Sequence, residues 1–137
     1  MGQINWWRVI VCGLVTGIVW TILSAISTWY LGADFDAAVP GNKVFAPSAG
    51  LFVFLLAVNF AGGIWAMWLY ASVRPRYGTG PKTALIVGFS WWFIVSLADA
   101  TWGSFRLVPI KALLPLSAVS LPEAIIAALV GASLYKE

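Results

Sequence analysis

The sequence has no histidine, one cysteine and few charged residues, and each shortage excludes a class of function. Without histidine, the chain lacks the commonest general base, metal ligand and axial haem ligand. Because Cys12 stands alone, no intramolecular disulfide and no two-cysteine redox chemistry is available. A serine nucleophile would need lysine as its base, and every lysine lies near the end of an expected helix or in a connection. The sequence therefore predicts no catalytic residue, no cofactor and no metal, and a protein that is not an enzyme.

Charge is too scarce for a soluble protein of this composition. Charged residues make up 9% of the chain, 61% of the residues are hydrophobic, and the mean hydropathy is +0.91. A soluble domain is about a quarter charged, because its surface must stay polar. Lipid must therefore solvate most of this chain. The basic residues are scattered near expected helix ends, which is typical of membrane orientation and not of nucleic-acid binding.

Four apolar segments predict an all-α integral membrane bundle that forms a single domain. Each segment exceeds the roughly 20 residues that a spanning helix needs. The first is too long for the apolar region of a signal peptide, so we expect it to be retained as a helix. Pro115 and Pro122 in the fourth predict a kink or a broken start. The expected spans are residues 6–31, 48–73, 82–105 and 111–135.

Two connections carry most of the turn-forming residues. A polar connection over residues 32–47 contains Asp34, Asp36, Pro40, Gly41, Asn42 and Lys43. Residues 74–82 predict a compact basic turn, in which Pro75 ends one helix and Pro81 lies in the first turn of the next. We expect the basic side chains of this turn to contact lipid headgroups; they are Arg74, Arg76 and Lys82.

The distribution of basic residues predicts that both termini are cytoplasmic. Alternating spans place five basic residues on the side of the termini, namely Arg8, Arg74, Arg76, Lys82 and Lys136. The other side has three, namely Lys43, Arg106 and Lys111. Cytoplasmic connections carry the excess of Lys and Arg in membrane proteins.

Three polar residues within the spans are candidates for function. Glu123 lies near the middle of the fourth span, where a charge costs about 2.5–3.5 kcal/mol or more. We expect it to face the bundle or a partner protein, protonated or hydrogen-bonded, with Asn59 or a hydroxyl such as that of Ser90 or Ser96 as its contact. Its role is either helix packing, which we favour, or a proton or ion pathway. For Asp99 we expect an ion pair with Arg106 or Lys111.

Small and aromatic residues indicate where helices pack. Gly13 and Gly17 form a small-xxx-small pattern, and Gly62 and Gly63 make a smooth patch in the second span, so close backbone approach is expected at both. Several of the nine tryptophans lie near span ends, as interfacial rings do. Four lie deeper, where packing is the favoured interpretation and an apolar ligand the alternative; they are Trp20, Trp65, Trp91 and Trp92.

One stretch resembles a family of small uncharacterised bacterial four-helix membrane proteins. It reads Trp68-Leu-Tyr-Ala-Ser-Val-Arg-Pro-Arg-Tyr-Gly-Thr-Gly-Pro-Lys-Thr-Ala-Leu85 and is similar to the family's RPRFGPGPKTA-like cytoplasmic turn. The ending Gly131-Ala-Ser-Leu-Tyr-Lys-Glu137 is similar to its GAWLYKE-like C-terminus, and the opening Ile4-Asn-Trp-Trp-Arg-Val-Ile10 also looks alike. The resemblance implies four helices and a multi-pass location in the bacterial inner membrane, but no activity.

These observations favour an accessory or structural subunit that packs against other membrane proteins or against itself. The chain consists of spanning helices with glycine-rich faces and has no catalytic groups, and each of these features favours a packing role. One alternative is a small oligomeric transporter or channel that uses Glu123 and Asn59. Another is a binder of lipid, quinone or carotenoid in a groove lined by tryptophan.

Overall fold

The computed structural model describes residues 4–38 and 48–136, and these form four α-helices and no strand. In chain order they are α1 (Trp6–Ala38), α2 (Ala49–Tyr77), α3 (Pro81–Ser104) and α4 (Ile110–Leu134). Each is long and apolar enough to cross a membrane, so the predicted all-α, four-helix multi-pass protein is confirmed. Part of the expected polar connection lies outside the described residues, namely Pro40, Gly41, Asn42 and Lys43.

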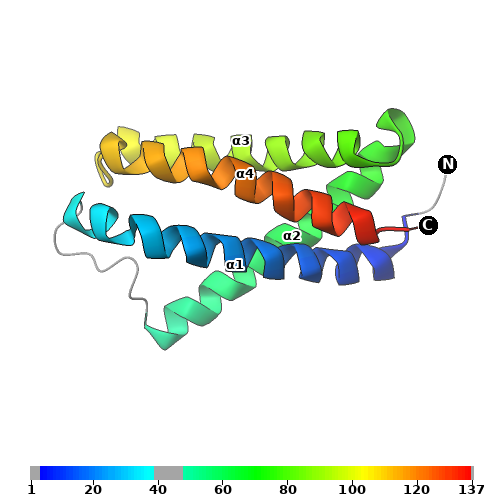
Figure 1. Ribbon diagram of the computed structural model, residues 1–137, viewed down its shortest axis with the longest axis horizontal. Helices are drawn as coiled ribbons and strands as arrows, with labels where there is room; N and C mark the ends of the chain where they lie inside the picture. The colour runs from blue at the N-terminus through cyan, green and yellow to red at the C-terminus, as the bar shows by residue number, and fades with distance from the viewer. Residues whose placement is uncertain (1–3, 39–47, 137) are drawn as a thin grey trace.

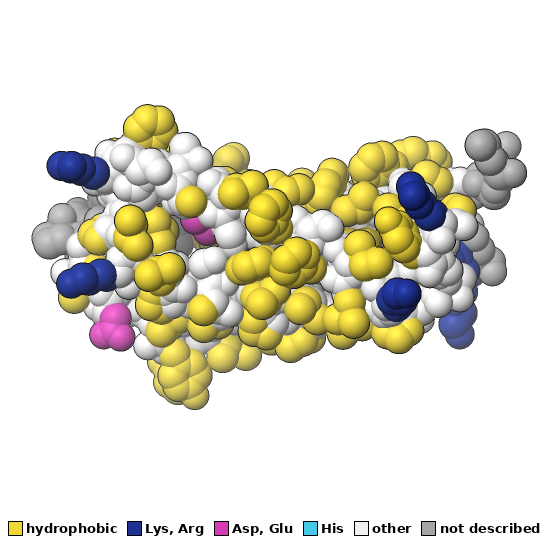
Figure 2. All heavy atoms as spheres, turned by 90° about the horizontal axis from the view of Figure 1, so that it is seen from above, with side chains coloured by type: hydrophobic (Ala, Val, Ile, Leu, Met, Phe, Trp, Pro, Cys, Tyr) yellow, Lys and Arg dark blue, Asp and Glu magenta, His cyan; other side chains and the backbone are white. Residues whose placement is uncertain are grey.

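The helices assemble around α1 and α4 (Figure 1). α1 packs along both α2 and α4, and α3 packs along α4 as an antiparallel hairpin, whereas α2 meets α3 and α4 less extensively. The start of α1 and the end of α4 lie at the same end of the bundle as the α2–α3 turn (Figure 1). The C-terminal end of α1 and the α3–α4 connection lie at the other end. Figure 2 shows hydrophobic side chains over the middle of one face and Lys or Arg toward its two ends.

α1 ends at Ala38, seven residues later than the sequence predicts. Its last two turns contain Asp34 and Asp36, which were expected in a polar connection. Phe35 gives the physical reason, because it is buried against Ala112 of α4 and can reach that position only from a continued helix. Burial of one aromatic ring contributes more than the weak helix propensities of the neighbouring residues cost.

α2 also ends later than predicted, at Tyr77, and Pro75 lies inside its last turn. A proline costs one backbone hydrogen bond, but other bonds close this helix end. The amide of Gly78 donates to Arg74 O at 2.9 Å, and that of Gly80 donates to the Tyr70 hydroxyl at 3.1 Å. Gly78 and Gly80 have φ angles of 86° and 119°, which favour glycine. α3 then begins at Pro81, one residue before the expected span, with this proline in its first turn as predicted.

α4 is one helix through both Pro115 and Pro122, so the predicted broken start is wrong. Contacts to the neighbouring α3 support the stretch between the two prolines. The indole of Trp92 donates to Ser117 O at 2.7 Å, and the Ser117 hydroxyl is 2.9 Å from that of Ser96. These contacts attach the stretch between the two prolines to α3, and support from a neighbouring helix is one reason why prolines are tolerated in membrane helices.

Glycines set the closest approaches between helices. A Cβ atom on Gly63 would lie 2.6 Å from Gly17 N and would also clash with Gly13 O. On Gly88 of α3, a Cβ would lie 2.8 Å from the Cα of Ile125 in α4. Only glycine allows the backbones to come so near, so α1 crosses α2 at the pair of small-residue patterns that the sequence contains.

Candidate functional site

Glu123 lies near the middle of α4 and faces the bundle, where its side chain is 7% exposed. Its carboxyl group meets two hydroxyl groups of α1. Ser24 Oγ donates to Glu123 Oε2 at 3.1 Å, and Ser27 Oγ is hydrogen-bonded to Glu123 Oε1. Two hydrogen bonds thus join the first and last helices at the depth where an isolated carboxyl group would be most costly.

Asn59 of α2 meets the same stretch of α1 from another side. Its Nδ2 donates to Thr21 Oγ1 at 3.1 Å, and the Thr21 hydroxyl donates to Gly17 O at 2.8 Å. Thr21, Ser24 and Ser27 are three residues apart and therefore follow one side of the helix. Together with Asn59 and Glu123 they form what we call the intramembrane polar cluster, in which α1 carries the hydroxyls for both partner helices.

Glu123 contacts hydroxyl groups, as one of the two expectations had it, but the residues named for that contact, Asn59, Ser90 and Ser96, are wrong. Ser90 donates to Ile86 O within α3, and Ser96 pairs with Ser117 of α4. Sequence reasoning missed Thr21, Ser24 and Ser27, although their regular spacing in an otherwise apolar segment was a detectable signal. A hydroxyl every third residue is typical of a helix that offers one polar stripe to its neighbours.

Asp99 does not form the ion pair that the sequence predicts. It is half-buried on α3, and within residues 48–136 no salt bridge joins it to Arg106 or Lys111. Arg106 lies in the turn after α3 with φ of 57°, where its amide donates to Gly103 O at 3.0 Å. That left-handed position closes the helix end in the way that a C-terminal glycine usually does, and it fixes Arg106 in the turn.

Three of the deeper tryptophans meet where α1, α2 and α3 come together. Trp91 lies edge-on to Trp20 and tilted against Trp65, with ring centroids 5.2 and 5.1 Å apart. A Cβ on Gly62 would lie 2.6 Å from Cζ2 of Trp91, so this ring fills the space above the glycine. The buried Nε1 of Trp91 has no hydrogen-bond partner among the described residues. Such close contacts favour packing over a ligand groove at this point.

The segments that carry the family resemblance lie against each other. The guanidinium of Arg74 lies over the ring of Tyr135 at 5.6 Å, and Tyr70 meets the same ring edge-on at 5.9 Å. The Tyr70 hydroxyl also accepts from Gly80 in the α2–α3 turn. Arg76 stacks over Tyr77, and Lys82 is exposed at the start of α3. The basic turn and the C-terminal segment thus form one structural unit, and headgroup contact by Arg74, Arg76 and Lys82 stays a prediction.

The polar cluster can hold three helices together, and it can hold a proton. It offers one carboxyl, three hydroxyls and one amide, without a second acid or a base among them. Within the described part of the chain, no three His, Cys, Asp or Glu residues gather as metal ligands do. Comparison with protein-family models, curated protein sequences and solved structures finds no match to this chain. What it does must therefore be inferred from its own residues.

Proposed function

We propose that the protein is a non-catalytic accessory or structural subunit that packs against another chain in the membrane. The observation that carries this proposal is the N-terminal half of α2, which diverges from the other helices (Figure 1). Leu51, Val53 and Phe54 are 61%, 65% and 67% exposed, although they point to different sides of the helix. Within the described part of the chain, this half-helix is exposed on more than one side, so it offers two or more faces to an apolar partner.

The polar cluster supports a structural role over transport. Glu123 and Asn59 are each hydrogen-bonded to hydroxyls of α1, so both are already used to join helices. Neither residue lines the cavity between α1 and α4 or the smaller one between α3 and α4. A transport site would need polar groups that line a wet path and change partners during the cycle.

Photocrosslinking in native membranes tests the proposal. A benzophenone amino acid at Val53 is expected to give one crosslinked species of discrete mass, because a partner helix would cover this position. The mass distinguishes a different subunit from a second copy of the chain. The product is detected by immunoblotting and identified by mass spectrometry.

Leu97 on α3 provides the matched control. It is 54% exposed and equally apolar, but it belongs to a hairpin that packs along its whole length. We expect the probe at Leu97 to give only lipid adducts. Lipid adducts alone at Val53 as well would refute the proposed role.

For the location, we propose the bacterial inner membrane with both termini in the cytoplasm. The supporting observations are the resemblance of the basic turn and the excess of basic residues at the end of the bundle that holds the termini. In a Cys12→Ala background, a cysteine at Ser104 should react with a membrane-impermeant maleimide in intact cells. A cysteine at Thr79 should react only after the cells are permeabilised. The reverse labelling pattern would invert the orientation.

A further inference from the structure

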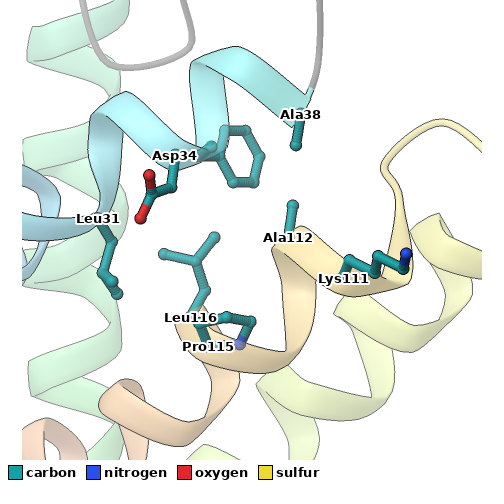
Figure 3. A pocket seen from close by; sticks show the side chains of 8 residues that line it. Leu31, Asp34, Ala38, Lys111, Ala112, Pro115 and Leu116 are labelled. Atoms are coloured by element: carbon teal, nitrogen blue, oxygen red, sulfur yellow. The ribbon is translucent and has the colours of Figure 1, made fainter.

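A cavity of about 220 Å³ lies between the last turns of α1 and the first turns of α4 (Figure 3). Its walls are mostly apolar: Leu31, Phe35 and Ala38 of α1, and Ala112, Pro115 and Leu116 of α4. In Figure 3 the Asp34 carboxylate lies above Leu116, whereas the Lys111 side chain extends away from the cavity. A single water needs only about 10–15 Å³ of such space, so the cavity has room for several.

Two polar groups at the cavity can hold water there. The exposed carboxylate of Asp34 is one of them. The backbone carbonyl of Lys111 is the other, because Pro115, one turn later in α4, has no amide hydrogen to donate to it. Both Lys111 and Pro115 line the cavity. α1 has 33 residues and is about 50 Å long, which exceeds the roughly 30 Å of a hydrocarbon core, so its last turns reach the water side of the membrane.

The helix faces that line the cavity continue to the intramembrane polar cluster. On α1, Ser27 precedes Leu31 by one turn and therefore lies on the same face. On α4, Glu123 follows Leu116 by seven residues, which is two turns along one face. Ser27 and Glu123 are hydrogen-bonded to each other. Their contact therefore lies directly inward of the cavity, with the side chains of Leu31 and Leu116 in between.

On the other side of Glu123 the interface between α1 and α4 is closed. Ala127, one turn further along α4, is fully buried, and so are Thr16 of α1 and Met67 of α2. A Cβ on Gly131 would lie 2.8 Å from the sulfur of Met67, so the helices meet here without space for water. Water can thus approach Glu123 along this interface from one end of the bundle and not from the end that holds the termini.

We propose that the cavity is a water-filled vestibule through which water, and protons with it, reaches Glu123 from the end of the bundle that holds the α3–α4 connection. Rotation of the Leu31 and Leu116 side chains opens the last step. The vestibule keeps the hydrogen bonds between α1 and α4 in exchange with water, so the carboxyl group can exchange a proton without leaving the bundle. Access from one end gives no path across the membrane, so this inference goes beyond the proposed structural role and does not depend on it.

Cysteine labelling of the full-length protein in lipid nanodiscs, in a Cys12→Ala background, tests the vestibule. The reagent is a small, positively charged methanethiosulfonate, which reaches both ends of the bundle and attacks only a hydrated, ionised thiol. We expect Leu31→Cys and Ser27→Cys to react about tenfold or more faster than Ala127→Cys, because a thiol in apolar surroundings is rarely ionised. Equally slow labelling of Ser27→Cys and Ala127→Cys would overturn the proposal.

A matched pair of substitutions at the end of α1 tests the route. Ala38 lines the cavity, whereas its neighbour Ala37 is exposed and does not. Ala38→Phe places a ring in the cavity and should slow the labelling of Ser27→Cys about tenfold, to the rate of a thiol without water. Ala37→Phe adds the same ring outside the cavity and should leave the rate unchanged. If Ser27→Cys reacts equally fast in both backgrounds, water arrives by another route and the proposal is refuted.

The unaltered polar cluster provides a second readout should Ser27→Cys fail to fold. A water-soluble carbodiimide with glycine ethyl ester converts a hydrated carboxyl group into an amide, and mass spectrometry of peptides locates the product. We expect Glu123 to be modified, more slowly in Ala38→Phe and at an unchanged rate in Ala37→Phe. A Glu123 that stays unmodified under conditions that modify Asp34 contradicts the vestibule.

Discussion

Replacing Gly63 by leucine is expected to separate α1 from α2 and to cost the bundle about 3 kcal/mol or more. The physical reason is backbone contact. A Cβ on Gly63 would meet Gly13 O and Gly17 N, and these atoms belong to a helix that cannot move away without losing α4 as well. A flexible side chain could rotate aside, but a helix backbone cannot. The effect should appear as lost monodispersity in size-exclusion chromatography and as a lower melting temperature in detergent.

Gly50 provides the matched control in the same helix. A Cβ at this position would meet no atom of the described residues within 4 Å, so Gly50→Leu adds the same apolar side chain without a clash with them. We expect Gly50→Leu to fold with nearly unchanged stability. Equal losses in both variants would show that the glycine content of α2, and not the crossing with α1, decides stability.

Glu123→Leu is the second change with a large expected effect, and Glu123→Gln is its counterpart. Leucine removes both hydrogen bonds to α1 and leaves the Ser24 hydroxyl facing an apolar side chain. Hydrogen bonds between membrane helices contribute about 0.6 kcal/mol on average and up to about 1.7 kcal/mol. We therefore expect Glu123→Leu to lose about 1–3 kcal/mol in an unfolding titration with a denaturing detergent, and Glu123→Gln to lose much less.

The donors and acceptors around residue 123 explain why Glu123→Gln should lose little stability. Ser27 has one hydroxyl proton but two neighbours that can accept it, Leu23 O at 3.2 Å and Glu123 Oε1. If Ser27 donates to Leu23, the second bond needs a donor on residue 123, which an amide N–H supplies as a protonated carboxyl would. The amide oxygen still accepts from Ser24.

A double-mutant cycle isolates the contribution of this contact. Ser24→Ala should destabilise the unaltered chain and the Glu123→Gln variant by similar amounts, but should add little to Glu123→Leu. If Glu123→Gln fails to assemble while Glu123→Leu behaves as the unaltered chain does, the hydrogen bonds to α1 are not what stabilises this region.

Helix number and position followed from composition and the length of the apolar segments, because a bilayer leaves a chain few alternatives. The helix ends were harder to predict. Asp34 and Asp36 have the polarity of a loop, yet burial of Phe35 about one turn beyond the expected end keeps the segment helical. Pro75 likewise signals a helix end in sequence, but bonds from Gly78 and Gly80 allow α2 to continue to Tyr77. Both errors arise from contacts that only the assembled bundle provides.

The candidate site was predictable in part. The cost of a carboxyl group at mid-membrane correctly placed Glu123 inside the bundle. The hydrogen-bond partners of Glu123 could not be predicted, because the choice among many serines depends on how the helices are arranged around each other. Asn59 and Glu123 both contact α1, and they do so from different helices, which a list of polar residues does not reveal. The cavity between α1 and α4 was hidden for the same reason, since it requires α1 to continue beyond Leu31.

The hydrogen bonds between α1 and α4 also impose an order on biogenesis. Ser27 and Glu123 are separated by 96 residues, so at about 5–20 residues per second the ribosome needs roughly 5–20 s to make the stretch between them. During that time the hydroxyls of Ser24 and Ser27 in α1 lack the hydrogen bonds that the Glu123 carboxyl group will later form with them. α4 then has to bring its acid into the lipid after the other three helices have been made. A chain truncated before Glu123 therefore leaves Ser24 and Ser27 of α1 without the carboxyl group that binds them.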